Sequence, residues 1–135
     1  MSLHHVALGA QDVDRVAKFY QTYFGLAELT RFWDENDALR SVWLSIPPGI
    51  LMIERSTHVA PRVEKIGKGP FLLAFSVSET ERLALESKLA RDHFDVEDRT
   101  DFTSYTRDPE GNRVAFSHHP GINEAAEKAK GPVSD

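Results

Sequence analysis

The sequence predicts an α+β fold in which two tandem βαβββ modules form a single domain, residues 1–135. The first observation behind this prediction is that the same order of strand-like and helix-like segments occurs twice along the chain. The two halves can be laid over one another at an offset of 67 positions, with His5 against Leu72 and Arg15 against Arg82. The second observation is that large apolar residues occupy one parity of each predicted strand, which is typical of a sheet with helices on one face.

The first module is expected at about 3–55, where a strand starting at His4 is followed by a helix over residues 11–26. Apolar residues recur in this helix at helical spacing, and Asp12 and Gly25 are residue types that begin and end helices. Three further strands complete the module, at 27–33, 40–46 and 50–55.

The second module is expected at about 70–118 and repeats this order with a strand at 71–77. Ser78 and Glu81 then have the spacing of a capping box, which predicts a helix over 78–93. Three further strands are expected at 94–98, 102–107 and 113–118. A polar connector at 56–69 separates the modules, and we expect the C-terminal tail at 119–135 to be a frayed helix or disordered.

Composition excludes several classes of function. The chain has no cysteine, so it has neither disulfides nor thiolate metal sites, and any metal would need nitrogen and oxygen ligands. Sixteen basic and twenty-one acidic residues give a net charge of −5 without a basic stripe, so nucleic acid is not an expected partner. We also expect no membrane partner and a cytoplasmic location, because the sequence shows no signal peptide pattern and no apolar run of the roughly 18 residues that span a bilayer.

The strand residues of the opposite parity have the composition of a ligand cavity. A solvated face would be rich in lysine and glutamate, whereas this set mixes small residues, a few large apolar ones and isolated polar or charged groups. Packing against another sheet or subunit is the alternative explanation. The set comprises His5, Ala7, Ser41, Trp43, Ser45, Ile50, Met52, Glu54, Leu72, Ala74, Ser76, Arg113, Ala115 and Ser117.

Two segments, "LHHVALGAQDVDRVAKFYQTYFGL" and the later "RDPEGNRVAF", resemble the vicinal oxygen chelate superfamily, which includes glyoxalase I, bleomycin resistance protein and extradiol dioxygenases. The resemblance covers residues 3–118. It implies two βαβββ modules whose curled mixed sheets surround a cavity, commonly completed by dimerisation, so we expect a homodimer. One fold supports several chemistries, so the resemblance alone does not select a reaction.

Enzymes of this superfamily hold a divalent metal on the first and last strands of their modules, and the metal acts as a Lewis acid. The resemblance places the corresponding positions of this chain on His5, Glu54, Leu72 and Ala115. Two of these four residues are apolar, so we expect an incomplete metal site and no cofactor. Binding of Ni, Zn, Fe or Mn by His5 and Glu54, with His119 as a late third ligand, is the alternative.

The candidate ligand-binding residues are His5, Trp43, Met52, Leu72, Arg113 and Ala115, and the candidate catalytic residue is Glu54. A carboxylate that faces a partly apolar cavity needs a partner, and we expect His5 or Arg113 to pair with Glu54 unless it serves as a general base. Trp43 and Met52 form either a soft wall for a planar ligand or part of the core. Arg113 either meets an anionic group or lies at the surface.

The sequence therefore supports two hypotheses. The first is a small-molecule-binding protein of the glyoxalase and bleomycin resistance type, acting in ligand binding or resistance or as a divergent enzyme. The second is a metal-dependent lyase or dioxygenase of the same superfamily that uses non-standard ligands. Loss of ligands at Leu72 and Ala115 favours the first hypothesis, and retention of His5 and Glu54 favours the second.

Overall fold

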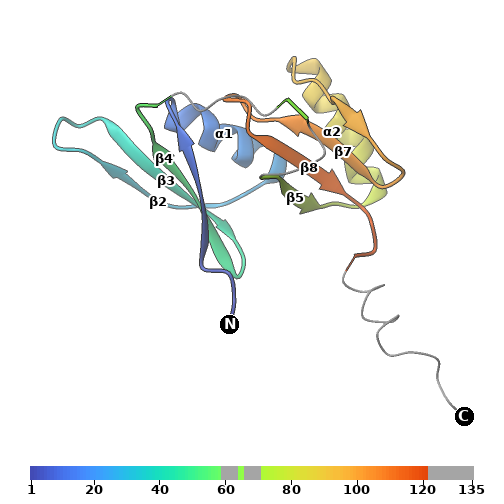
Figure 1. Cartoon of the computed structure of the whole chain (residues 1–135), viewed down its shortest axis with the longest axis horizontal. Coiled ribbons are helices and arrows are strands. Elements are labelled where there is room, and N and C mark those ends of the chain that lie inside the picture. Colours follow the sequence, from blue (N-terminus) through green and yellow to red (C-terminus); the bar gives the residue numbers. More distant parts are fainter. Residues whose placement is uncertain (59–63, 66–70, 122–135) are drawn as a thin grey trace, which may run out of the picture.

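The computed structural model describes residues 1–58, 64–65 and 71–121. These residues form two four-stranded sheets and two helices in an order that occurs twice along the chain (Figure 1). The elements are β1 (His5–Ala10), α1 (Val13–Phe24), β2 (Glu28–Trp33), β3 (Leu39–Ile46), β4 (Gly49–Arg55), β5 (Leu73–Ser76), α2 (Glu79–Arg91), β6 (Asp98–Arg99), β7 (Thr103–Arg107) and β8 (Arg113–Ser117).

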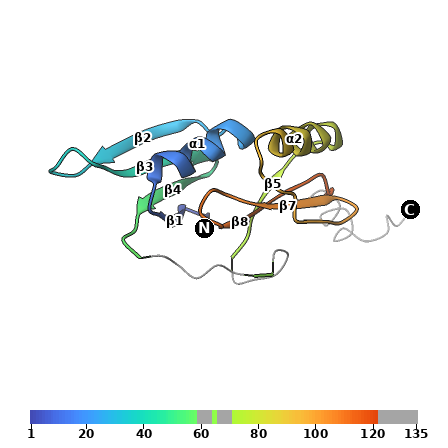
Figure 2. The ribbon, with the colours of Figure 1, turned by 90° about the horizontal axis from the view of Figure 1, so that it is seen from above.

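Both sheets are mixed and have the same topology. The strand order is β1-β4-β3-β2 in one sheet and β5-β8-β7-β6 in the other, and β1 and β5 are the strands that pair in parallel with their neighbours. This confirms the predicted α+β fold of two tandem βαβββ modules. The two sheets do not close on one another, and Figure 2 shows both helices on the same side of them. The predicted connector and tail fall largely outside the described residues.

Helix α1 has the ends that the sequence predicts. The Asp12 side chain accepts a hydrogen bond from the Arg15 backbone amide at 3.1 Å. Gly25 ends the helix in the left-handed conformation, with φ of 66°, which glycine adopts without steric cost. In α2, Ser78 and Glu81 form the predicted capping box.

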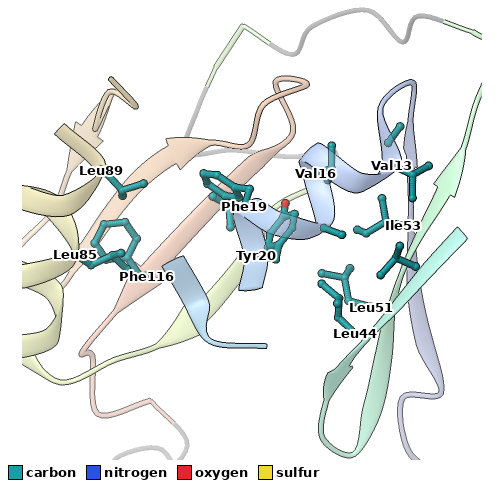
Figure 3. Packing of buried hydrophobic residues seen from close by; sticks show 14 residues of the cluster. Val13, Val16, Phe19, Tyr20, Leu44, Leu51, Ile53, Leu85, Leu89 and Phe116 are labelled. Atoms are coloured by element: carbon teal, nitrogen blue, oxygen red, sulfur yellow. The ribbon is translucent and has the colours of Figure 1, made fainter. Parts of the chain in front are cut away.

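The hydrophobic core lies between the helices and the covered faces of the sheets (Figure 3). Its fully buried apolar strand residues have the predicted parity, with the exception of Ala115, and the buried residues of α1 recur at helical spacing. Helix α1 lies over β3 and β4, and neither of the two described helices lies on the opposite face of that sheet. The core includes Val16, Phe19, Tyr20, Val42, Leu44, Leu51, Ile53, Leu85, Leu89, Val114 and Phe116.

Two predictions for the second module are wrong. Phe71, which the sequence places in a strand on the covered face, precedes β5 and is 80% exposed. Its carbonyl accepts a hydrogen bond from the Arg113 guanidinium instead of joining a strand ladder. The strand expected at 94–98 is reduced to β6, because the Asp95 carbonyl is held by the Thr106 hydroxyl at 2.7 Å.

One buried hydrogen bond joins the two modules. The Tyr20 hydroxyl of α1 donates to Asp108 Oδ2 at 2.9 Å, in the turn before β8. Asp108 also accepts from the Asn112 backbone and side-chain amides, which fixes the shape of that turn. Burial raises the pKa of Asp108, although the hydrogen bonds from Asn112 and Tyr20 act in the opposite direction.

The neighbouring Glu110 forms a second link between the modules. Its two carboxylate oxygens accept from the backbone amides of Gln11 at 2.7 Å and Asp12 at 2.9 Å, just before α1. A carboxylate at this place satisfies amide groups that have no partner within the helix. The turn before β8 therefore orients α1, and with it the sheet that α1 covers.

Candidate functional site

The candidate site lies on the face of the first sheet that points away from α1, which we call the first-module face. Side chains alternate along a strand, so the residues that flank the buried core positions point to this face. The register aligns Ser41 with Glu54 and Trp43 with Met52 across β3 and β4. The first-module face comprises His5, Ala7, Gly9, Phe32, Ser41, Trp43, Ser45, Ile50, Met52 and Glu54.

The Glu54 carboxylate is held by two neutral donors from the neighbouring strand. Its Oε1 atom accepts from the Ser41 hydroxyl at 2.8 Å and from the Trp43 indole nitrogen at 3.3 Å. Neither His5 nor Arg113 forms the pair with Glu54 that the sequence suggested, since their recorded partners lie elsewhere. Ser41 is 1% exposed and Glu54 is half-buried, so the carboxylate is oriented but still reachable.

Aromatic residues form a wall beside this carboxylate. The Trp43 and Phe32 rings lie 5.0 Å apart between centroids and are tilted by 60°. The Arg40 guanidinium lies 5.8 Å from the Phe32 centroid, within the range of a cation–π contact. Trp43 and Met52 are half-buried and do not belong to the buried core, so they bound this face of the sheet.

His5 lies at the start of β1 and is exposed. Its Nδ1 is 2.8 Å from Nδ1 of His4, and the two rings are in edge contact, although the sequence placed them on opposite faces. This differs from the prediction because His4 precedes β1, so strand alternation does not fix its direction. The register pairs His5 with Ile50 and Gly9 with Glu54. His5 and Glu54 are therefore four positions apart along the sheet, or roughly 13 Å.

The donor set does not fit a divalent metal with nitrogen and oxygen ligands. Within residues 1–58, 64–65 and 71–121, no three histidine, aspartate or glutamate side chains come together in a way that could hold an ion. Of the second-module positions in the expected ligand set, Leu72 lies before β5, and Ala115 lies fully buried between Ala74 and Tyr105 in the sheet. His119, the further candidate ligand, packs against Phe102 at 5.0 Å between ring centroids.

The corresponding face of the second sheet holds two buried arginines. Arg113 is 4% exposed and donates to the backbone carbonyls of Lys65, at 2.8 Å, and Phe71. Arg107 is 6% exposed and donates to Glu97 at 2.8 Å and to the Gly111 carbonyl at 3.0 Å. Arg113 is thus not at the surface, and it holds backbone that precedes β5.

A hollow of about 400 Å³ lies elsewhere, on the side of the helices. Its lining includes Tyr23, Phe24, Phe75, Leu85 and Lys88, from α1, β5 and α2. Phe24, Phe75 and Leu85 belong to the core or pack against it. Ser76 is the one residue of the predicted cavity set that lines this hollow, and none of the candidate catalytic, ligand-binding or metal residues does, so we place the candidate site on the first-module face.

Sequence reasoning missed Phe32 and did not single out Ser41 among the residues of its parity. The signal for Ser41 was present, because a small polar residue at the parity of Trp43 suits a partner for a cross-strand carboxylate. Phe32 gave a weaker signal. Polar and aromatic residues occur on both parities of β2, "ELTRFW", so alternation does not separate its two faces.

The chain matches the family "Glyoxalase/Bleomycin resistance protein/Dioxygenase superfamily" over residues 2–116. No functionally curated protein matches it significantly. In the part of the chain that the structure describes, neither helix has the length and apolar character needed to cross a membrane.

Several solved structures share the fold. A fosfomycin resistance protein FosX mutant from Listeria monocytogenes, with Mn(II) and 1S,2S-dihydroxypropylphosphonic acid, is 15% identical with a TM-score of 0.75, covering 93% of this chain and 97% of its own. A possible glyoxalase from Bacillus cereus is 23% identical with a TM-score of 0.66, covering 87% and 98%. Lactoylglutathione lyase from Agrobacterium tumefaciens is 21% identical with a TM-score of 0.61, covering 86% and 92%.

Proposed function

The chain belongs to the glyoxalase/bleomycin resistance protein/dioxygenase superfamily, and we propose that it binds a small organic molecule on its first-module face without a complete metal site. It acts as a ligand-binding or resistance-type protein, or as a divergent enzyme in which Glu54 is the acid–base group. The possible glyoxalase and the lactoylglutathione lyase of similar fold are named for chemistry on small molecules, which supports this class of ligand.

The observation that carries the proposal is the arrangement of Glu54, Ser41 and Trp43. A carboxylate oriented by two neutral donors beside an aromatic wall is a polar group placed to fix a ligand on a partly apolar surface. A cationic partner would compensate the charge of this carboxylate. Among the described residues, no arginine, lysine or histidine forms an ion pair with Glu54.

We also infer a homodimer, in which a second copy covers the uncovered faces of the sheets. The two sheets of one chain do not close on each other, and Ala7 and Ala74 are exposed small residues on those faces. Apolar and small residues on an uncovered sheet face suit the approach of another sheet. Light scattering of the purified chain is expected to give the mass of two copies, and a monomer over a wide concentration range would contradict this inference.

Superfamily enzymes use a metal, and FosX was solved with Mn(II). Here Leu72 and Ala115 supply no ligand atom, and His5 and Glu54 are too far apart within one chain to share an ion. The proposed function therefore includes no step that depends on a metal. Glu54 itself can accept a proton or a hydrogen bond from a bound molecule.

The experiment that tests the proposal uses Trp43 as a reporter. The chain has two tryptophans, and a Trp33→Phe protein leaves Trp43 as the single indole. Titration of this protein with a panel of aromatic and anionic small molecules is expected to give a saturable change in fluorescence. Calorimetry with the same compounds is expected to show several-fold weaker binding after Trp43→Phe and unchanged binding after Trp33→Phe, since Trp33 is outside the site. No saturable response across the panel would contradict the proposal.

A further inference from the structure

We propose that the first-module face selects ligands with a cationic nitrogen on a flat aromatic group, such as an amidinium or an aromatic ammonium. The cation would lie against the Glu54 carboxylate and the aromatic group against Trp43. This inference rests on the proposed function and adds the chemical class of the ligand.

The charge of the first-module face favours a cationic ligand. Glu54 carries the negative charge of the cluster, and both recorded donors to it, Ser41 and Trp43, are neutral, so its charge is not compensated by them. Only Oε1 takes part in these hydrogen bonds, and no described residue donates to Oε2. A carboxylate has about four acceptor positions. A half-buried carboxylate that has no cationic partner favours a ligand that carries a positive charge.

The nearby cationic side chains already have other partners. Arg55, the next residue along β4, pairs with Asp34 at 2.8 Å. Arg40 lies over Phe32. The exposed His5 contacts His4 and lies four positions from Glu54 along the sheet. Arg55 is thus compensated by Asp34 and Arg40 lies over Phe32, so the carboxylate is the anionic group that a ligand on this face would meet.

The aromatic wall favours the same class of ligand. A cation next to an indole ring is attracted by the negative face of the ring, and tryptophan gives the strongest such contact of the natural side chains. The placement of the Arg40 guanidinium beside Phe32 is an instance of this contact in the same aromatic pair. Because Trp43 also donates to Glu54, the indole and the carboxylate stay in a fixed relation.

Strand β1 leaves space for a flat ligand beside the carboxylate. Gly9 is aligned with Glu54 and Ala7 with Met52, and both small residues are exposed. A Cβ atom at position 9 would lie 3.3 Å from Ser56 Cβ, so a larger residue there would press against the Ser56 side chain. Strand β1 therefore presents only small side chains at the positions next to Glu54 and Met52, where the ligand would lie.

An anionic ligand fits the described residues less well. The buried Arg113 and Arg107 belong to the second sheet, and both already donate to backbone carbonyls, with Arg107 also donating to Glu97. A phosphate or carboxylate near Glu54 would face a like charge. Such like-charge contacts select against a ligand.

The test compares benzamidinium, benzamide and benzoate, which share one ring and differ in charge, on the Trp33→Phe protein by Trp43 fluorescence. Benzamidinium is expected to bind most tightly. Glu54→Gln keeps an acceptor oxygen for Ser41 and Trp43, so the thermal unfolding midpoint is expected to stay close to that of the parent. Benzamidinium affinity is expected to fall at least tenfold, as for loss of a charge-assisted hydrogen bond. Glu79→Gln on α2 removes the same charge away from the face and is expected to leave the affinity unchanged.

Three outcomes would overturn the cation proposal. The first is benzoate or benzamide binding as tightly as benzamidinium, which would leave the proposed small-molecule site intact. The second is unchanged benzamidinium affinity in Glu54→Gln. The third is weaker dimerisation of Glu54→Gln without any effect on the cation, because the carboxylate would then serve a contact between subunits. Absence of a saturable response to any compound of the wider panel would instead overturn the proposed function.

Discussion

The two modules share one topology but differ in the chemistry of the sheet faces that have no helix. On the first-module face, Glu54 has neutral donors and stays reachable. On the second, Arg107 and Arg113 are buried and donate mainly to backbone carbonyls. The uncovered faces of both modules therefore carry charged groups, but Glu54 lies near the end of β4 and Arg113 at the start of β8. We propose that Glu54 is available to a ligand, whereas the two arginines stabilise the chain.

This contrast teaches that strand parity identifies a face but not the use of its residues. Glu54 and Arg113 both have the parity of the uncovered faces. Their roles diverge because the partners differ: side chains of the adjacent strand for Glu54, and backbone before β5 for Arg113. The following predictions test that division.

The largest effect is expected from Arg113→Met, which keeps much of the side-chain volume and removes the guanidinium. The carbonyls of Lys65 and Phe71 would lose their donor inside the protein. We expect the free energy of unfolding to fall by about 2–4 kcal/mol, measured by urea denaturation. Ligand affinity on the first-module face is expected to stay the same in the folded fraction. A variant of normal stability with impaired ligand binding would reverse the roles that we assign to the two faces.

A smaller loss is expected from Tyr20→Phe, which removes the buried hydrogen bond between the modules. Loss of a hydrogen bond to an ionised carboxylate should cost about 1–3 kcal/mol near neutral pH. Burial raises the pKa of Asp108 above its usual value of 3.8, so this carboxyl becomes protonated in the folded chain at a pH where the unfolded chain is still ionised.

The sign of the pH effect follows from that shift. The folded state binds the extra proton, so the contribution of Asp108 to stability decreases as pH rises from 3.8 through the raised pKa. The Tyr20 hydroxyl matters most to the ionised form, so the destabilisation by Tyr20→Phe should shrink as pH falls through the same range. Chemical denaturation of both proteins at several pH values checks this. A pH-independent difference would show that Asp108 does not titrate there.

A still smaller effect is expected from Ser41→Ala, which removes the shorter of the two hydrogen bonds to Glu54. We expect a loss of about 1 kcal/mol in the free energy of unfolding and a several-fold weaker ligand affinity, because the carboxylate is less well oriented. Ser45→Ala, at the same parity of β3 but outside the hydrogen-bonded cluster, is the matched control. Equal effects of both substitutions on affinity would argue against a positioning role for Ser41.

Local patterns were sufficient to predict the fold class and most of the first-module face, although not Phe32 or Gly9. Alternation in β3 and β4 placed Trp43, Met52 and Glu54 together, and the capping residues set both ends of α1 and the start of α2. These features depend on neighbours within a few positions of the sequence.

The contacts that depend on register or on distant backbone could not be predicted in the same way. The parallel pairing of β1 with β4 separates His5 from Glu54, and nothing within either strand determines that offset. The partners of Arg113, at positions 65 and 71, lie more than 40 residues earlier in the chain. That Leu72 and Ala115 carry no ligand atom follows from their side-chain chemistry alone, and the incomplete metal site inferred from it stays a prediction.

The smallest expected effect concerns metal. Equilibrium dialysis against Ni, Zn, Fe and Mn salts, followed by elemental analysis, is expected to leave the protein with substoichiometric metal, and His5→Ala is expected to change nothing. Two nitrogen or oxygen ligands at separated positions give weak and unselective binding, since even open iron sites use three protein ligands. Stoichiometric binding that disappears in His5→Ala would show that a second copy brings further ligands to His5. The first-module face would then belong to a metal enzyme, and the contrast between the two modules would lie in which of them keeps its ligands.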